Sequence, residues 1–209
     1  YKMKNMQESR DTKLWADVFA QLSEFFKEPS MEFAGDVASG RLHGFFEESL
    51  AASGIDQSLL MGLLLKGDVY STLSEEYRRL FLGPLPPYIV PAESAYKRWA
   101  NDPECTLPLA GEKGYLMGDP AIDMIKRYQA HGILIPDKYV SMPDHIALEL
   151  EYMSFLCNNK YEEEQEDFIH SRLDWIDDLK DDISNVCESG FYRTAIYLTS
   201  AFVNFLSRQ

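Results

Sequence analysis

The sequence predicts an all-α fold, a compact bundle of about eight helices with a long proline-rich connection in the middle of the chain. Apolar residues recur at helical spacing along most of the 209 residues, and strand-length runs of alternating polarity are nearly absent. Glycine and proline gather between residues 83 and 118. Hydrophobic residues make up 45% of the chain and charged residues 26%, as in ordinary globular proteins. We therefore expect one domain over residues 1–209.

Four helices are expected in the first part of the chain. The first carries an apolar stripe from Leu14 to Phe26 and stops at Pro29. Similar spacing predicts the next three over residues 32–52, 57–65 and 68–82.

The connection over residues 83–118 is irregular because glycines and prolines interrupt every helical pattern. Loops of this length are uncommon in compact domains and are usually functional or disordered. Its aromatic residues predict a loop that packs against the protein; they are Tyr88, Tyr96, Trp99 and Tyr115.

Helical patterns return in the last third of the chain. Asp119 and Pro120 suit an N-cap and a first helical residue, which predicts a helix to about residue 131. Residues 141–144 open another helix, and its apolar character over 145–158 places it at the centre of the core. The remaining patterns lie over residues 161–179 and 191–206, with a stop at Ser189 and Gly190.

Charge and cysteine content exclude several classes of partner. The chain has 34 acidic and 20 basic residues, a net charge of −14, which argues against nucleic acid and anionic membranes and is compatible with a basic partner. No apolar run approaches the ~18–20 residues of a membrane span, and we expect no signal peptide. Three cysteines without a C-x-x-C pair predict a reducing compartment and neither a zinc knuckle nor a redox pair.

The usual catalytic and cofactor motifs are missing. The sequence has no G-x-S-x-G elbow, no phosphate-binding loop and no dinucleotide fingerprint. A di-iron site needs Glu-x-x-His twice, and Asp167 with His170 is one loose match. We expect no metal and no organic cofactor.

Two clusters remain as candidate sites. Tyr77, Leu80 and Phe81 lie where a helix runs into a proline-fixed loop, and they form either a preformed groove or ordinary core at i, i+3, i+4. Asp144 and His145 lie at a helix start as a catalytic pair, a structural histidine or a ligand anchor. Neighbouring helical residues do not face each other, and no nucleophile is evident, so the structural or anchoring role is favoured.

Three stretches in order resemble the TorD/DmsD family of redox-enzyme maturation chaperones. Residues 76–84 resemble the family's E-x-Y-x-x-L-F-x-G-P stretch and match it from Tyr77 on. Residues 91–96 match P-x-E-S-x-Y, and residues 143–153 match P-D-H-I-x-x-E-L-x-x-M. The resemblance covers roughly residue 10 to the C-terminus. It departs at Ala92, where the family commonly has an aromatic residue.

The resemblance implies a cytoplasmic, all-helical chaperone and not an enzyme. Such a protein binds the twin-arginine leader peptide and the apo catalytic subunit of a molybdopterin oxidoreductase, and it assists cofactor insertion and assembly before export. We expect a monomer or homodimer. The peptide-binding residues that the resemblance implies are Tyr77, Leu80, Phe81, Pro91, Asp144 and His145. We add Glu93, Ser94 and Tyr96 from the P-x-E-S-x-Y stretch.

Simple chemistry agrees with this function. A twin-arginine leader joins two cations to an apolar stretch, and an apolar groove with Asp144 or Glu93 at its rim would offer both halves. Two alternatives stay open: a small-molecule enzyme that uses Asp144 and His145, and a structural subunit of an oxidoreductase complex.

Overall fold

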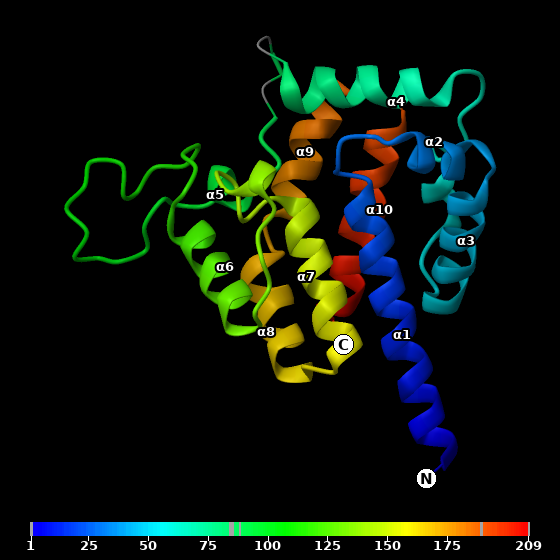
Figure 1. Ribbon diagram of the computed structural model, residues 1–209, viewed down its shortest axis with the longest axis horizontal. Coiled ribbons are helices and arrows are strands. Elements are labelled where there is room, and N and C mark those ends of the chain that lie inside the picture. The colour runs from blue at the N-terminus through cyan, green and yellow to red at the C-terminus, as the bar shows by residue number, and fades with distance from the viewer. Residues whose placement is uncertain (1, 84–85, 88, 189, 209) are drawn as a thin grey trace.

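A computed structural model describes residues 2–83, 86–87, 89–188 and 190–208. Within these residues the chain forms ten α-helices and no strand (Figure 1). The all-α prediction is confirmed, and the count is slightly higher than the expected eight. An isolated antiparallel bridge joins Ala92 to His145.

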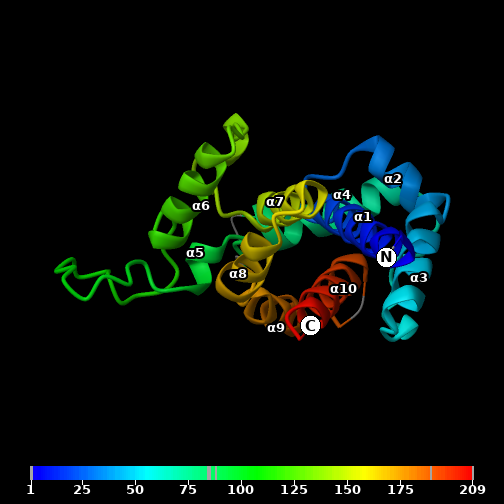
Figure 2. The same cartoon turned by 90° about the horizontal axis from the view of Figure 1, so that it is seen from below.

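The core is built around α7, Ile146–Asn159, as the sequence predicted. Helix α1, Lys2–Glu24, packs along α7, and the two lie side by side in both views (Figures 1 and 2). The Ser154 hydroxyl donates to the Ala16 carbonyl oxygen at 2.7 Å and fixes their contact. On the other side of the core, α10, Phe191–Leu206, packs against α9, Ile176–Val186.

Two expected helices are wrong in extent. The segment expected as one helix over 32–52 is two, α2, Met31–Ala38, and α3, Arg41–Ser53. Gly40 has φ 76°, a left-handed conformation that ends one helix and favours glycine. Only a 3₁₀ turn, Gln57–Leu60, forms within the helix expected over 57–65.

Helix α4, Val69–Tyr77, crosses the end of the bundle formed by α1, α7, α9 and α10 (Figure 1). It continues into a π-helical turn, Arg78–Leu82, so the expected helix over 68–82 changes its winding in the last five residues. Single π-helical turns are rare and occur frequently at functional sites.

The connection over 83–118 contains one helical turn, α5, Glu93–Tyr96, and then a segment that projects from the bundle (Figures 1 and 2). Backbone bonds close its base, and the Trp99 Nε1 donates to the Leu116 carbonyl oxygen at 3.2 Å. Tyr115, expected to pack, is 52% exposed. Pro84 and Tyr88, two residues of the sequence analysis, lie outside the described residues, as does Ser189.

The remaining helices frame α7. Helix α6, Asp119–Ala130, has Gly118 as its N-cap, so the cap expected at Asp119 is one residue off. Helix α8, Glu162–Arg172, follows α7 directly, and a break before α9 divides the segment expected over 161–179. None of the described helices has the length and apolar character needed to span a membrane.

Candidate functional site

A cavity of about 300 Å³ lies where five segments meet: the turn after α1, the α4–π junction, residues 90–91, the projecting loop at Leu116 and the segment 138–145. It contains four of the nine predicted residues: Tyr77, Phe81, Pro91 and His145. The other residues that line it are Glu28, Leu82, Val90, Leu116, Lys138, Tyr139 and Met142.

The apolar wall comes from the π-helical junction. Tyr77 is buried and its ring packs 5.1 Å from that of Phe81, while Tyr192 of α10 lies 5.6 Å from Phe81. Phe81 is only partly buried and lines the cavity, whereas Leu80 is 1% exposed. The sequence left open whether these residues form a groove or the core. In the structure Leu80 belongs to the core, and Phe81 faces the cavity.

His145 forms the polar wall. It is the N-cap of α7, and its Nδ1 accepts from the Ala147 backbone N–H at 3.1 Å. Burial lowers the pKa of His145 to about 3, with the charge of Lys138 adding to the effect. The ring is therefore neutral at pH 7 and carries its proton on Nε2. Because Nδ1 is occupied by the cap, Nε2–H is the donor left for a ligand.

Asp144 lies behind this wall and not at the rim. It is 0% exposed, and its Oδ2 accepts from the Ser94 backbone N–H at 2.6 Å. Its carbonyl oxygen accepts from the Glu93 N–H at 3.0 Å, and the Pro91 carbonyl accepts from the Ile146 N–H at 2.9 Å. Asp144 thus anchors residues 91–94 to the start of α7, and the expected rim carboxylate at Asp144 is wrong.

Glu93 is also fully buried, so the expectation of a rim carboxylate is wrong there too. It pairs with Lys97, whose Nζ lies 2.6 Å from its Oε1, and with Arg172 at 3.5 Å. Burial raises the pKa of Glu93 and raises that of neighbouring Glu149 well above its usual range. The Trp175 Nε1 donates to Glu149 at 3.0 Å. Glu93, Glu149 and their partners support the residues of the cavity wall but do not line the cavity themselves.

Ser94 and Tyr96 also lie away from the cavity lining. Ser94 is 0% exposed. Tyr96 stacks on Trp175 with 5.1 Å between ring centroids, and its hydroxyl donates to Asp182 at 2.9 Å. Both residues hold the turn that follows Pro91.

Sequence reasoning missed three further kinds of lining residue. Glu28 follows α1 with no motif around it, and Leu116 comes from the projecting loop. Lys138 and Tyr139 precede the recognised 143–153 stretch by a few residues, so their proximity to that motif was the one available signal.

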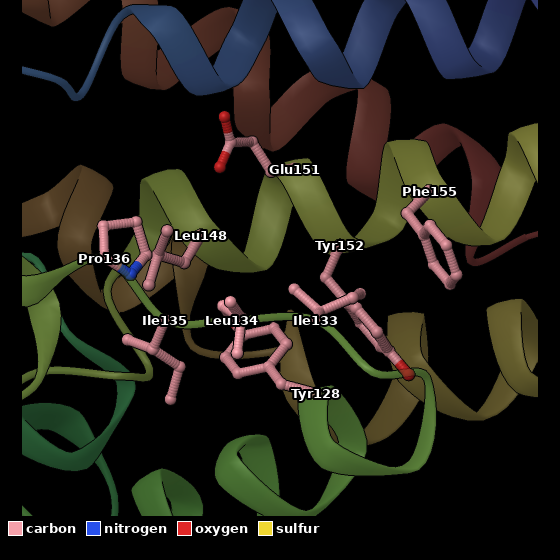
Figure 3. A pocket seen from close by; sticks show the side chains of 9 residues that line it. All are labelled: Tyr128, Ile133, Leu134, Ile135, Pro136, Leu148, Glu151, Tyr152 and Phe155. Atoms are coloured by element: carbon pink, nitrogen blue, oxygen red, sulfur yellow. The ribbon is translucent and has the colours of Figure 1, made fainter.

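A second, more apolar cavity of about 250 Å³ lies further along α7. Figure 3 shows Leu148, Tyr152 and Phe155 of α7 facing residues 133–136, with Tyr128 of α6 beside them. Both cavities are lined by the segment between α6 and α7, which ends at His145, the N-cap of α7. Leu134 at this cavity is 90% exposed.

The site offers binding chemistry. Among the described residues, no group of three or more His, Cys, Asp or Glu side chains is placed to hold a metal ion. Asp144 and His145 form no relay, because Nδ1 of His145 bonds to the α7 backbone and Asp144 bonds to the backbone of Ser94. The lining combines aromatic and aliphatic faces with the neutral N–H donor of His145 and two charged side chains, Glu28 and Lys138.

Comparison with known proteins gives a matching family model and similar solved structures. A family model described as nitrate reductase delta subunit matches residues 49–186. The crystal structure of a candidate redox enzyme maturation protein from Archaeoglobus fulgidus is similar, with a TM-score of 0.54 and 20% sequence identity. That similarity covers 91% of this chain and 93% of the other, and at this identity it shows a shared fold. No curated protein matches this chain.

Proposed function

This chain belongs to the nitrate reductase delta subunit family, a TorD-like family of chaperones and not of catalysts, and we propose that its cavity binds the leader peptide of its client. Membership makes the protein a redox-enzyme maturation chaperone that interacts with a redox enzyme subunit. The small-molecule enzyme suggested as an alternative is excluded by the same membership.

One observation carries the proposal. Tyr77, Phe81, Pro91 and His145 come from three separate stretches of the sequence, and all line one cavity. If these residues only filled the core, the three stretches would have no reason to meet at an open cavity. Their meeting there favours a ligand that contacts all three stretches.

The cavity suits a peptide with an apolar anchor. Tyr77 and Phe81 offer aromatic faces to an apolar side chain, and the Nε2–H of His145 suits a peptide carbonyl oxygen. At about 300 Å³ the cavity is at the lower end of ligand pockets, roughly 300–1,000 Å³. It therefore takes anchor side chains, while the rest of the leader lies on the surface.

In the full proposal, the chain works in the cytoplasm as a single domain, either as a monomer or as a homodimer. It holds the twin-arginine leader of a molybdopterin oxidoreductase subunit and so delays export until the cofactor is inserted. The neutral state of His145 makes this binding insensitive to pH between about 6 and 8.

Calorimetric titration of the chain with leader peptides from the molybdoenzymes of the same organism tests the proposal. We expect saturable binding of one peptide per chain, and weaker binding of scrambled peptides of equal composition. Equal heats from leader and scrambled peptides, or no heat from either, would show that the cavity is not a leader site.

A further inference from the structure

Glu28 is the one acidic side chain among the described residues that line the cavity. It is exposed and stands just after the end of α1. No described side chain forms an ion pair or hydrogen bond with its carboxylate. An uncommitted carboxylate beside an apolar cavity is suited to a cation on the ligand.

Two other carboxylates near Glu28, those of Glu24 and Glu151, already share an ion pair with one lysine. The Nζ of Lys27 lies 2.6 Å from Glu24 Oε1 and also contacts Glu151. Although burial opposes the charged form, these two carboxylates raise the pKa of Lys27 above its usual value, so its charge is permanent at neutral pH. Glu28 is therefore the free acidic group here.

The end of α1 adds to the attraction. Its C-terminal carbonyl groups carry the negative end of the helix dipole, and no basic residue occupies its last turn. The turn that follows reaches the cavity wall, where the Tyr77 hydroxyl donates to the Phe26 carbonyl oxygen at 3.4 Å. The negative end of the α1 dipole and the Glu28 carboxylate would therefore both attract a cation on the ligand.

The segment 138–145 contributes two donor side chains to the same lining, and donors suit oxygen atoms of a ligand. Lys138 lies with its Nζ 4.9 Å from the centre of the Tyr139 ring, and it contributes to the lowered pKa of His145. The Lys138 ammonium and the His145 Nε2–H are both donors, and the one acceptor of the two side chains, Nδ1 of His145, already accepts from the Ala147 backbone N–H. The cavity lining thus carries one carboxylate and two donor side chains.

We infer that Glu28 selects a basic side chain of the bound leader, and that Lys138 and His145 donate to its carbonyl oxygens. This inference rests on the leader-binding function proposed above. It assigns to Glu28 the role that the sequence had suggested for Asp144 or Glu93.

The test uses two variants that change net charge equally. Glu28→Gln removes the carboxylate at the cavity, and Glu32→Gln removes an exposed carboxylate in the first turn of α2 that does not line it. The probe is a synthetic leader with two adjacent arginines before an apolar run, and a second peptide has both arginines replaced by glutamine.

We expect Glu28→Gln to weaken binding of the arginine peptide roughly 3- to 10-fold. Glu32→Gln should change it by less than about twofold, because a distant charge is screened. The two variants should bind the glutamine peptide alike. Glu28→Arg should bind a peptide with glutamates in place of the arginines more tightly than the unmodified protein does.

Equal losses in Glu28→Gln and Glu32→Gln would overturn the assignment, because only net charge would then matter, and leader binding itself would stand. Failure of the unmodified protein to bind either peptide would overturn the proposed function and the assignment with it. Melting curves for each variant check folding, and we expect no shift because both side chains are exposed.

Discussion

Truncation of Phe81 distinguishes a cavity residue from a core residue, and its neighbour Leu80 is a matched control. Leu80 is 1% exposed, so Leu80→Ala leaves an enclosed void and should destabilise the protein by about 3 kcal/mol. For a chain of this size this is a drop of roughly 6–12 °C in melting temperature.

Phe81→Ala should behave differently because one side of the ring already faces open space. It loses contacts with Tyr77 and Tyr192 but creates no enclosed void, since water can enter the widened cavity. We expect a loss of about 1–2 kcal/mol in stability, or roughly 2–8 °C.

The affinity for a leader peptide should show the opposite order. Phe81→Ala removes an aromatic face of the proposed site and should weaken binding at least about fivefold. Leu80→Ala should retain nearly full affinity in its folded fraction. Thermal melts by circular dichroism and calorimetric titration at 15 °C measure both quantities. A loss of melting temperature in Phe81→Ala as large as that in Leu80→Ala, with unchanged affinity, would refute the assignment of Phe81 to the cavity.

Three further substitutions probe the buried polar groups. The pKa of His145 is near 6.5 in the unfolded chain and about 3 in the folded protein, so the free energy of unfolding falls as pH drops below 6.5. His145→Asn keeps an N-cap but removes this titration. Measured by urea unfolding, the stability lost between pH 7 and pH 5 should therefore be smaller in the variant by about 1–2 kcal/mol. Because the pKa of Glu149 is raised in the folded state, the unmodified protein loses stability as pH rises above 4.5. Glu149→Gln does not have this loss, so the difference in unfolding free energy between the variant and the unmodified protein should shift in favour of the variant from pH 5 to pH 8. Asp144→Ala leaves the buried Ser94 N–H without an acceptor and should destabilise by about 1–3 kcal/mol in the same assay, whereas Asp144→Asn, which keeps an oxygen there, should lose clearly less.

The sequence predicted the features that depend on local pattern. Helix α10 begins and ends at the expected residues because a continuous apolar pattern follows Gly190. The break at Gly40 was missed because glycine is tolerated inside helical patterns, and its left-handed conformation depends on how α2 and α3 pack.

The charges of the site were harder to predict for a related reason. Carboxylates are exposed by default, and Glu93 is buried only because Lys97 and Arg172, which lies on α8, converge on it. Glu28 has no sequence pattern at all, since it reaches the cavity through the packing of α1 against α7. Recognition of three stretches identified walls of the cavity, but not which polar atoms face it.

The docking of α1 on α7 has a consequence for how this chaperone is itself made. The contact between Ser154 and Ala16 joins residues 138 positions apart, so the apolar stripe of α1 lacks its main partner until α7 has been synthesised. At a synthesis rate of about 5–20 residues per second, α1 waits for roughly 7–28 s. During this interval the part of the α1 stripe that α7 covers in the folded protein stays exposed on the nascent chain. The cavity, whose lining spans residues 28 to 145, also forms only after most of the chain has been synthesised.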